Sequence, residues 1–376
     1  MRAGRDTAGS GWRRVAATVA AMLTFTGCGV LPGSNQTEGP CPDQWRAAAL
    51  WSTQNGSAST LSYVKGDGSV EERALPYLGF EASRADTIER RGTDTVMVSN
   101  GNLDRDKTHI VTVSATCAVT GVQVDEAVAL GVATSPEAVF TTGWLNGAAW
   151  IHRHDPAGTA TEIRFPGLSI AKPVAYGSKV YAFATEDAAG DAPLLLVLDA
   201  TSLTEVARVP LSSDTGSVFD ALVKDGTLYY PLTGPSDGSR EGDSLGAIDL
   251  TTLKRTEVPL EAPSPYLLAA TDDAIYIGHT FMNNGYRPMT EYVWITRYTP
   301  STGKTETFDV GTAAGIGINA IAATSDSLYV LGTDSDSPDS ATLLAFDTTT
   351  MTTTSQTRIP APSRPGHHYL AGLIVP

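Results

Sequence analysis

The residues best suited to metal binding or catalysis are two histidines separated by a single residue. His152 and His154 belong to the run His-Arg-His-Asp at the end of a predicted strand. Side chains two apart on a strand share a face, so these imidazoles and the nearby Asp155 could ligate zinc. The sequence places no third or fourth ligand beside them. We therefore favour the alternative, a strand end that turns at Pro156, and predict no metal site.

Acidic and aromatic residues gather in the long predicted loops. Loops held by a rigid scaffold commonly carry binding residues, and aromatic side chains such as Phe281 and Tyr286 suit recognition. We predict a surface for a ligand or partner that contains Phe281, Tyr286, Asp237, Asp243, Asp334 and Asp336. The alternative is that the acidic loops serve only solubility. The chain has no glycine-rich phosphate loop, nucleophile elbow or metalloprotease helix, so we predict no catalytic residue.

The elements that must position these residues are short strands in a repeat. The clearest unit is 218–260, where four apolar runs follow one another. Asp225 and Gly226 separate the first two runs, and this pair is a strong hairpin signal because a two-residue turn needs positive φ. The unit recurs about every 50 residues, which is the period of propeller blades.

Three short sequence features, here called landmarks, recur in the same order along the repeat. The second strand opens on an aliphatic-Tyr pair, the third ends in a turn rich in Asp and Thr, and the fourth closes on aliphatic-Pro. The landmark residues are Tyr181, Tyr229, Tyr276 and Tyr329; Asp199, Asp249 and Asp347; Pro210, Pro259 and Pro360. A single blade cannot bury both faces of its sheet, so each needs neighbours. The alternative is a β-sandwich with chance self-similarity.

We predict an all-β fold: a single β-propeller of seven four-stranded blades, with six and eight as alternatives because the first part of the chain repeats poorly. Residues 369–375 resemble the first strand of the sixth blade, and we expect them to complete blade 1 and close the ring. Residues 45–51 are expected to form a short helix or an irregular lead-in. Three strands are expected for the compact third blade, within 137–167.

The repeat resembles those of bacterial YVTN-type and quinoprotein-like propellers. The resemblance covers about residues 170–360 and rests on aliphatic-Tyr, aliphatic-x-Asp-x-x-Thr and aliphatic-Pro. It implies a fold rather than a function. Quinoprotein enzymes also carry a Trp in each repeat turn, which the matching turns here lack. We therefore expect no quinone and predict no cofactor.

The N-terminus carries an export pattern. Residues 1–27 have a basic start and a short apolar core, as in a secretory signal. The run Phe-Thr-Gly-Cys, which ends at Cys28, resembles the bacterial lipobox, and the resemblance implies lipidation of Cys28. We expect a flexible tether over 28–40 and the propeller over 41–376. Ordinary secretion with loss of Cys28 is the alternative, and the export route stays open.

The remaining cysteines form an even pair. The chain contains 3 Cys, and if Cys28 takes lipid, Cys41 and Cys117 are left in an exported protein, where disulfides persist. We predict a Cys41–Cys117 disulfide, with two buried free thiols as the alternative.

The net charge of −15 argues against nucleic acid as a partner. We expect a monomer held by a lipid anchor on the outer face of the cytoplasmic membrane, where its acidic loop-rich face meets an envelope protein or ligand. The predicted role is a non-catalytic binding or scaffold module. The alternative is a propeller enzyme, a lyase or glycan hydrolase, with its site at the mouth of the central channel.

Overall fold

The described part of the chain is built from β-strands. The computed structural model describes residues 39–81, 85–101, 107–156, 158–186, 192–235, 239–280, 293–310 and 316–376, without 335–336. Two short 3-10 turns, η1 (Ala85–Thr87) and η3 (Ser213–Thr215), interrupt the strands. Within these ranges we find no helix long and apolar enough to cross a membrane.

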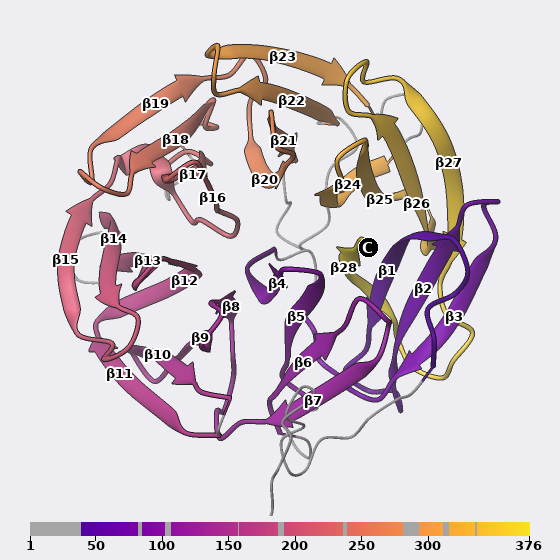
Figure 1. Cartoon of the computed structure of the whole chain (residues 1–376), viewed down its shortest axis with the longest axis horizontal. Coiled ribbons are helices and arrows are strands. Elements are labelled where there is room, and N and C mark those ends of the chain that lie inside the picture. The colour runs from indigo at the N-terminus through magenta and orange to yellow at the C-terminus, as the bar shows by residue number, and fades with distance from the viewer. Residues whose placement is uncertain are drawn as a thin grey trace, which may run out of the picture. The chain divides into compact units, whose positions relative to one another are not determined.

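Seven four-stranded antiparallel sheets form the blades of a β-propeller (Figure 1), which confirms the predicted fold class. In each blade the strands are given from the axis outward. Blade 1 contains β28 (Tyr369–Ile374), β1 (Trp45–Ser52), β2 (Ser59–Lys65) and β3 (Val70–Leu75). Blade 2 contains β4 (Ile88–Arg91), β5 (Asp94–Ser99), β6 (His109–Val113) and β7 (Val119–Gln123). Blade 3 contains β8 (Gly131–Thr134), β9 (Val139–Leu145), β10 (Ala148–His154) and β11 (Ala160–Pro166).

The other four blades hold the clear repeats. Blade 4 contains β12 (Leu168–Tyr176), β13 (Lys179–Glu186), β14 (Ala192–Asp199) and β15 (Glu205–Pro210). Blade 5 contains β16 (Leu222–Lys224), β17 (Thr227–Leu232), β18 (Ser244–Asp249) and β19 (Arg255–Pro259). Blade 6 contains β20 (Pro265–Ala270), β21 (Ile275–His279), β22 (Trp294–Thr299) and β23 (Lys304–Asp309). Blade 7 contains β24 (Ile316–Ala323), β25 (Ser327–Asp334), β26 (Ser337–Asp347) and β27 (Thr353–Pro360).

The C-terminal strand closes the ring, as predicted. Strand β28 pairs with β1, with Leu373 opposite Ala49, and supplies the innermost strand of blade 1. The prediction of a helix or irregular lead-in for 45–51 is wrong, because this segment is β1. Strand β1 is buried from Ala47 onward, because blade 2 packs on one of its faces and blade 7 on the other. Its sequence therefore lacks the alternation of polar and apolar residues that marks a half-buried strand.

The first strand of blade 3 was missing from the sequence prediction. Strand β8 has only four residues, and just Val132 and Ala133 are buried hydrophobics. So short a strand gives too few residues to show a period of two.

The hydrophobic core lies between the blades. The buried side chains form seven clusters, and each cluster joins two neighbouring blades. One cluster, for example, packs Phe183 and Leu195 of blade 4 against Leu228 and Tyr230 of blade 5. Every blade therefore depends on both of its neighbours, as expected for a closed repeat.

The Asp landmark of the repeat is a hydrogen-bonded turn. Asp249 Oδ1 accepts from the backbone N–H groups of Thr251 (3.0 Å) and Thr252 (2.7 Å) and from the Thr252 hydroxyl (2.9 Å). The next residue, Leu253, has φ 58°, so the chain reverses into the fourth strand. Asp199 and Asp347 make the same contacts in blades 4 and 7.

At the interface between blades 6 and 7, the landmark Tyr of one blade makes a hydrogen bond to the Asp turn of the next. Tyr276 of blade 6 is buried, and its hydroxyl donates to the carbonyl of Thr348, inside the Asp347 turn of blade 7, at 3.0 Å. At this interface the two landmarks keep phase because the Tyr of blade 6 lies against the turn of blade 7.

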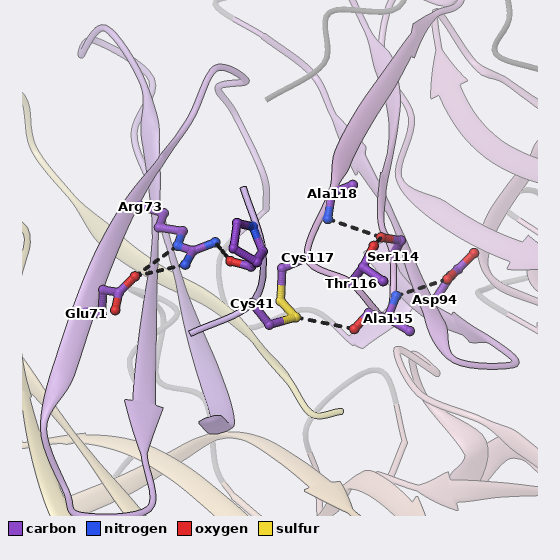
Figure 2. Close-up of a disulfide and its surroundings, with 10 residues drawn as sticks. Cys41, Glu71, Arg73, Asp94, Ser114, Ala115, Thr116, Cys117 and Ala118 are labelled. Atoms are coloured by element: carbon purple, nitrogen blue, oxygen red, sulfur yellow. Dashed lines mark hydrogen bonds and ion pairs between the residues drawn. A yellow bond between two sulfur atoms is a disulfide. The ribbon is translucent and has the colours of Figure 1, made fainter. Parts of the chain in front are cut away.

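A disulfide joins Cys41 and Cys117 (Figure 2), the pairing that the sequence predicted. Cys41 precedes β1, whereas Cys117 lies in the turn between β6 and β7 with φ 62°. The bond ties the chain before blade 1 to the outer part of blade 2. Beside it, the Arg73 guanidinium donates to the Pro40 carbonyl at 2.5 Å, which also holds the entering chain on β3.

Candidate functional site

Most of the sequence-predicted binding residues lie outside the described part of the chain. Phe281, Tyr286, Asp237 and Asp336 belong to that group, as does Cys28. Asp334 ends β25, and only its backbone is described. Asp243 is exposed immediately before β18, where its carboxylate accepts from the Ser244 hydroxyl at 3.1 Å.

A cavity of about 490 Å³ lies on the propeller axis between the inner strands of the blades. Its walls are mainly aliphatic, and Val174, Leu268, Ile321 and Leu373 are typical. Polar side chains enter from several blades: Glu89, Arg90, Thr95, Lys172, Asp220 and Asn319. An apolar pocket with a few convergent polar groups is the usual form of a small-molecule site.

Lys172 is the central charge of the axial cavity. The pairing of β12 with β13 shifts register between Ile170 and Pro173, and such bulges redirect side chains. The Lys172 side chain is 2% exposed, and its Nζ donates to Glu89 Oε2 at 3.0 Å and to the Ala85 carbonyl at 3.4 Å. These contacts reach from blade 4 to blade 2.

The surrounding carboxylates keep this lysine charged. Burial alone would lower the pKa of Lys172, but the nearby Glu89, Asp220 and Asp86 outweigh burial and raise its pKa. A buried ammonium is expensive unless carboxylates compensate it. Asp86 is fully buried in η1, so the compensation comes from the interior as well as from the cavity wall.

Asp220 is the most perturbed acid in this cavity. It lies just before β16, and its Oδ2 accepts from the Leu268 backbone N–H of blade 6 at 2.6 Å. Burial raises the pKa of Asp220 to about 7, although the Lys172 charge and this hydrogen bond act in the opposite direction. Asp220 can therefore gain or lose a proton near neutral pH.

Two basic side chains, Lys172 and Arg90, and two acidic ones, Glu89 and Asp220, line the cavity. Arg90 also lines it, but its guanidinium donates to the backbone oxygens of Gly92 (3.0 Å) and Pro376 (2.6 Å). Lys172 remains, facing Glu89 and Asp220. The cavity therefore offers both hydrogen-bond donors and acceptors to the polar head of a ligand.

Sequence reasoning missed the axial residues, although a signal existed. Lys172 is the only charged residue of Leu168–Tyr176, and Asp220 interrupts an apolar run. A lone charge in an inner strand must be compensated by other strands, and the sequence does not say which. The first apolar run of the 218–260 unit forms a strand only from Leu222, since Asp220 bonds to the neighbouring blade instead.

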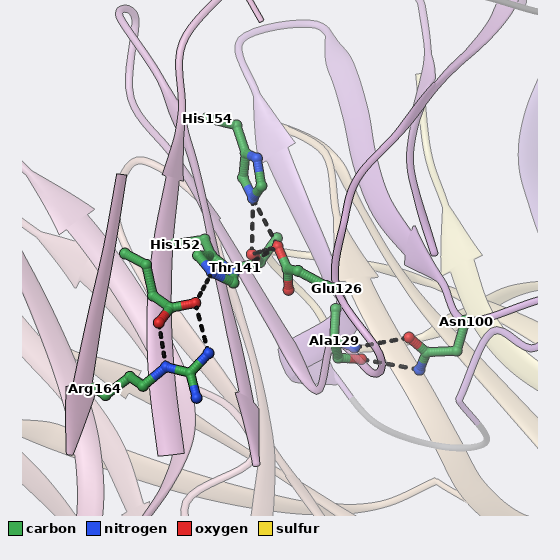
Figure 3. Close-up of polar contacts among 8 residues, drawn as sticks. Asn100, Glu126, Ala129, Thr141, His152, His154 and Arg164 are labelled. Atoms are coloured by element: carbon green, nitrogen blue, oxygen red, sulfur yellow. Dashed lines mark hydrogen bonds and ion pairs between the residues drawn. The ribbon is translucent and has the colours of Figure 1, made fainter. Parts of the chain in front are cut away.

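The two histidines named from the sequence do share a site, and a glutamate joins them (Figure 3). Glu126 Oε1 lies 2.8 Å from His154 Nε2 and 3.0 Å from His152 Nδ1. Asp155 is not part of the group, since it pairs with Arg153. Glu126 could not be found from the sequence, because it comes from the connection between β7 and β8.

Charge and burial set the protonation of this group. Burial would raise the pKa of Glu126, but His152, His154 and Thr141 outweigh burial and lower its pKa to about 2. Burial would lower the pKa of His152, and the Glu126 and Glu162 carboxylates outweigh burial and raise it. Glu126 is therefore an anion throughout the physiological pH range.

No protein-family model matches this chain, and no curated protein matches it. Solved structures do share its fold. Apo AztD from Citrobacter koseri has 10% identity and a TM-score of 0.50, over 88% of this chain and 98% of that chain. Cobalt-substituted apocarotenoid oxygenase from Synechocystis has 11% identity and a TM-score of 0.53, over 92% of this chain and 96% of that chain. At these identities the likeness shows the propeller fold alone.

Proposed function

We propose that this protein is an exported, non-catalytic binding protein of the cell envelope that takes a small ligand into its axial cavity. The buried Lys172, with carboxylates around it, carries the proposal. Burying charges costs stability unless they are well compensated, and an aliphatic interior would be cheaper. The N-terminal pattern of residues 1–27 supports export, and the lipobox-like run supports a lipid on Cys28 that holds the protein at the outer face of the cytoplasmic membrane.

The cavity favours an amphipathic ligand. Its volume of about 490 Å³ lies within the range of sites for small organic molecules. The aliphatic walls suit an apolar body, whereas Asp220 and Glu89 suit an amine, amide or hydroxyl head. Lys172 has three N–H groups and two protein acceptors in the described structure, so it can also donate to the ligand.

Thermal melting tests this proposal. The full-length protein in mild detergent is melted with a panel of amphipathic amines, amides and alcohols, and binding raises Tm. Each stabilising compound is then tested on Lys172→Gln and on Lys254→Gln, a control at an exposed turn lysine. We expect the Tm increase to persist in Lys254→Gln and to disappear in Lys172→Gln. An unchanged increase in Lys172→Gln, or no stabilising compound, would reject the axial site.

The acidic loops are the proposed surface for a partner protein. Exposed Asp243 is the member of this surface whose side chain the structure describes. Crosslinking and affinity capture from the native membrane, with a variant that lacks 281–291, tests the surface. One stoichiometric partner that the variant loses supports a scaffold role, whereas retention of that partner argues against these loops.

A catalytic role is the second candidate, and the Asp220 pKa of about 7 favours it. A group with such a pKa can serve as a general acid or base at neutral pH. If a ligand found in the panel is also turned over, we expect Asp220→Asn to bind it but to lose the rate. A rate that survives in Asp220→Asn would leave binding as the function of the cavity.

A further inference from the structure

We propose that Glu126, His152 and His154 form a binding site for one divalent transition-metal ion, with Zn²⁺ as the best fit. The site is separate from the proposed ligand cavity, since none of its residues lines that cavity. The three side chains each offer one ligand atom, and these atoms all lie within 4.8 Å of one another. Two imidazoles and one carboxylate with an open fourth position are a common Zn²⁺ ligand set.

The hydrogen bonding of the group is incomplete without an ion. Glu126 Oε2 and His152 Nδ1 are buried and lack hydrogen-bond partners among the described residues. His152 Nδ1 is 3.0 Å from Glu126 Oε1, yet the pair does not have hydrogen-bond geometry. Buried polar atoms without partners are rare and need an explanation. A cation supplies one, because it would take a lone pair from His152 Nδ1 and bind the Glu126 carboxylate, whose Oε1 lies next to both imidazoles.

The spacing is close to that of a metal site. Two ligand atoms around tetrahedral Zn²⁺ stand about 3.3 Å apart, given bonds of about 2.0 Å. The Glu126 Oε1 distances to His154 Nε2 and His152 Nδ1 are 2.8 and 3.0 Å. Small side-chain rotations would therefore admit the ion. The His152 and His154 side chains are 11% and 14% exposed, so the group lies just below the protein surface.

Outer contacts already hold the ligands in place (Figure 3). His152 Nε2 lies 2.6 Å from Glu162 Oε2, and Arg164 in turn pairs with Glu162. This leaves Nδ1 of His152 for the metal, an arrangement that metal-bound histidines usually show. The Thr141 hydroxyl donates to Glu126 Oε1 at 2.5 Å.

The loop that carries Glu126 is also fixed. The Asn100 side chain donates to the Ala129 carbonyl at 2.9 Å and accepts from the Ala129 N–H at 2.8 Å, as a neighbouring strand would. Asn100 follows β5 of blade 2, whereas both histidines belong to β10 of blade 3. A bound ion would thus cross-link two blades, and we expect it to raise the melting temperature.

Calorimetric titration with ZnCl₂ tests the proposal on the full-length protein, prepared without a polyhistidine tag and freed of metal with EDTA. We expect one Zn²⁺ per chain, binding about 100-fold weaker in His154→Ala and Glu126→Gln, and about 10-fold weaker in Glu162→Gln. The matched control is the double variant His367→Ala/His368→Ala, which removes an adjacent pair outside the site and should bind as the wild type does.

Three results would overturn the site: no Zn²⁺ binding by the wild type, unchanged affinity in His154→Ala and Glu126→Gln, or loss of binding in the His367→Ala/His368→Ala control. A second measurement does not depend on folding of the variants. The visible spectrum of the Co²⁺-loaded wild type should show the strong bands of four- or five-coordinate Co²⁺ with nitrogen ligands. The weak spectrum of six-coordinate Co²⁺ would contradict the proposal.

Discussion

At the scale of single residues, Asp220 should make stability fall as pH rises. Its pKa is about 7 in the folded protein and ordinarily 3.8, so the folded state binds more protons between about pH 4 and 7. The ionised carboxylate then costs at most about 4 kcal/mol above pH 7. We expect the free energy of unfolding of Asp220→Asn, relative to the wild type, to increase by about 2 to 4 kcal/mol from pH 5 to pH 8.

Urea unfolding at both pH values measures this change. Asp225→Asn is the control, since Asp225 is 85% exposed in a hairpin turn. A difference between Asp220→Asn and the wild type that is equal at pH 5 and pH 8 would show that Asp220 titrates normally in the folded protein.

His279 has the opposite effect to Asp220: it should make the protein less stable as the pH falls. It is fully buried, its Nδ1 donates to the Pro263 carbonyl at 2.7 Å, and its Nε2 therefore accepts from the Thr296 hydroxyl at 2.8 Å. Burial lowers the pKa of His279 from 6.5 to about 4. The unfolded state binds more protons in that interval, so the stabilisation present above pH 6.5 is lost as the pH falls towards 4.

We expect His279→Gln to be less stable than the wild type at pH 7 and nearly equal to it at pH 4.5. The free energy of unfolding by which the wild type exceeds His279→Gln should shrink by at most about 3 kcal/mol between pH 7 and pH 4.5. Unfolding curves at the two pH values check it. Equal destabilisation at both would mean that the imidazole contributes only its hydrogen bonds.

At the scale of elements, three blades each have a strand glycine against which an aromatic ring packs directly. A Cβ at Gly246 would lie 2.3 Å from Tyr230, and Gly121 and Gly143 stand in the same relation to Tyr77 and Trp150. The Tyr230 ring also packs against Phe183 of the neighbouring blade, with 5.0 Å between ring centroids. The glycine therefore makes room for a ring that joins two blades.

Gly246→Ala should destabilise the protein by about 1 to 3 kcal/mol, because the methyl group displaces the Tyr230 ring. In the Tyr230→Leu background the same substitution should cost much less. A double-mutant cycle from urea unfolding measures the coupling. Additive effects of the two changes would argue that the ring moves away freely.

An element could be predicted from the sequence where its contacts are local within one repeat. The turn at Asp249 was recognisable because its Asp, Thr and Leu act within five residues of chain. Strand β1 was not, because blade 2 buries one of its faces and blade 7, near the other end of the chain, buries the other. The Lys172 and Glu126 sites also depend on partners from other blades, and spacing in the sequence carries no such information.

At the scale of the whole molecule, the disulfide secures the start of the ring. It spans 76 residues between Cys41 and Cys117. The chain-entropy model gives about 4 kcal/mol for closing such a loop. We expect the double variant Cys41→Ala/Cys117→Ala to lose about that much free energy of unfolding. If the oxidised wild type and the double variant had equal urea midpoints, the contacts of Arg73 and the blade interfaces would be enough to hold the start of the ring without the disulfide.

The end of the ring is held without a covalent bond. Strand β28 buries Leu370, Ala371 and Leu373 between blades and lines the axial cavity. Without it, β1 would present an open sheet edge, which invites pairing with other chains. A variant that ends at residue 366 should therefore aggregate or melt well below the wild type. It would also lose the Arg90 contact with Pro376.

Addition of a peptide with the sequence of residues 367–376 distinguishes a missing strand from a general loss of folding. The peptide can pair with β1 as β28 does, by strand addition. We expect it to restore the melting temperature of the truncated protein in a concentration-dependent way. A peptide with Leu373→Asp should not, because Leu373 lies opposite Ala49 in a buried position. Equal rescue by both peptides would mean that the ring closes by backbone pairing alone. Failure of both would mean that β28 is needed earlier, while the other blades assemble.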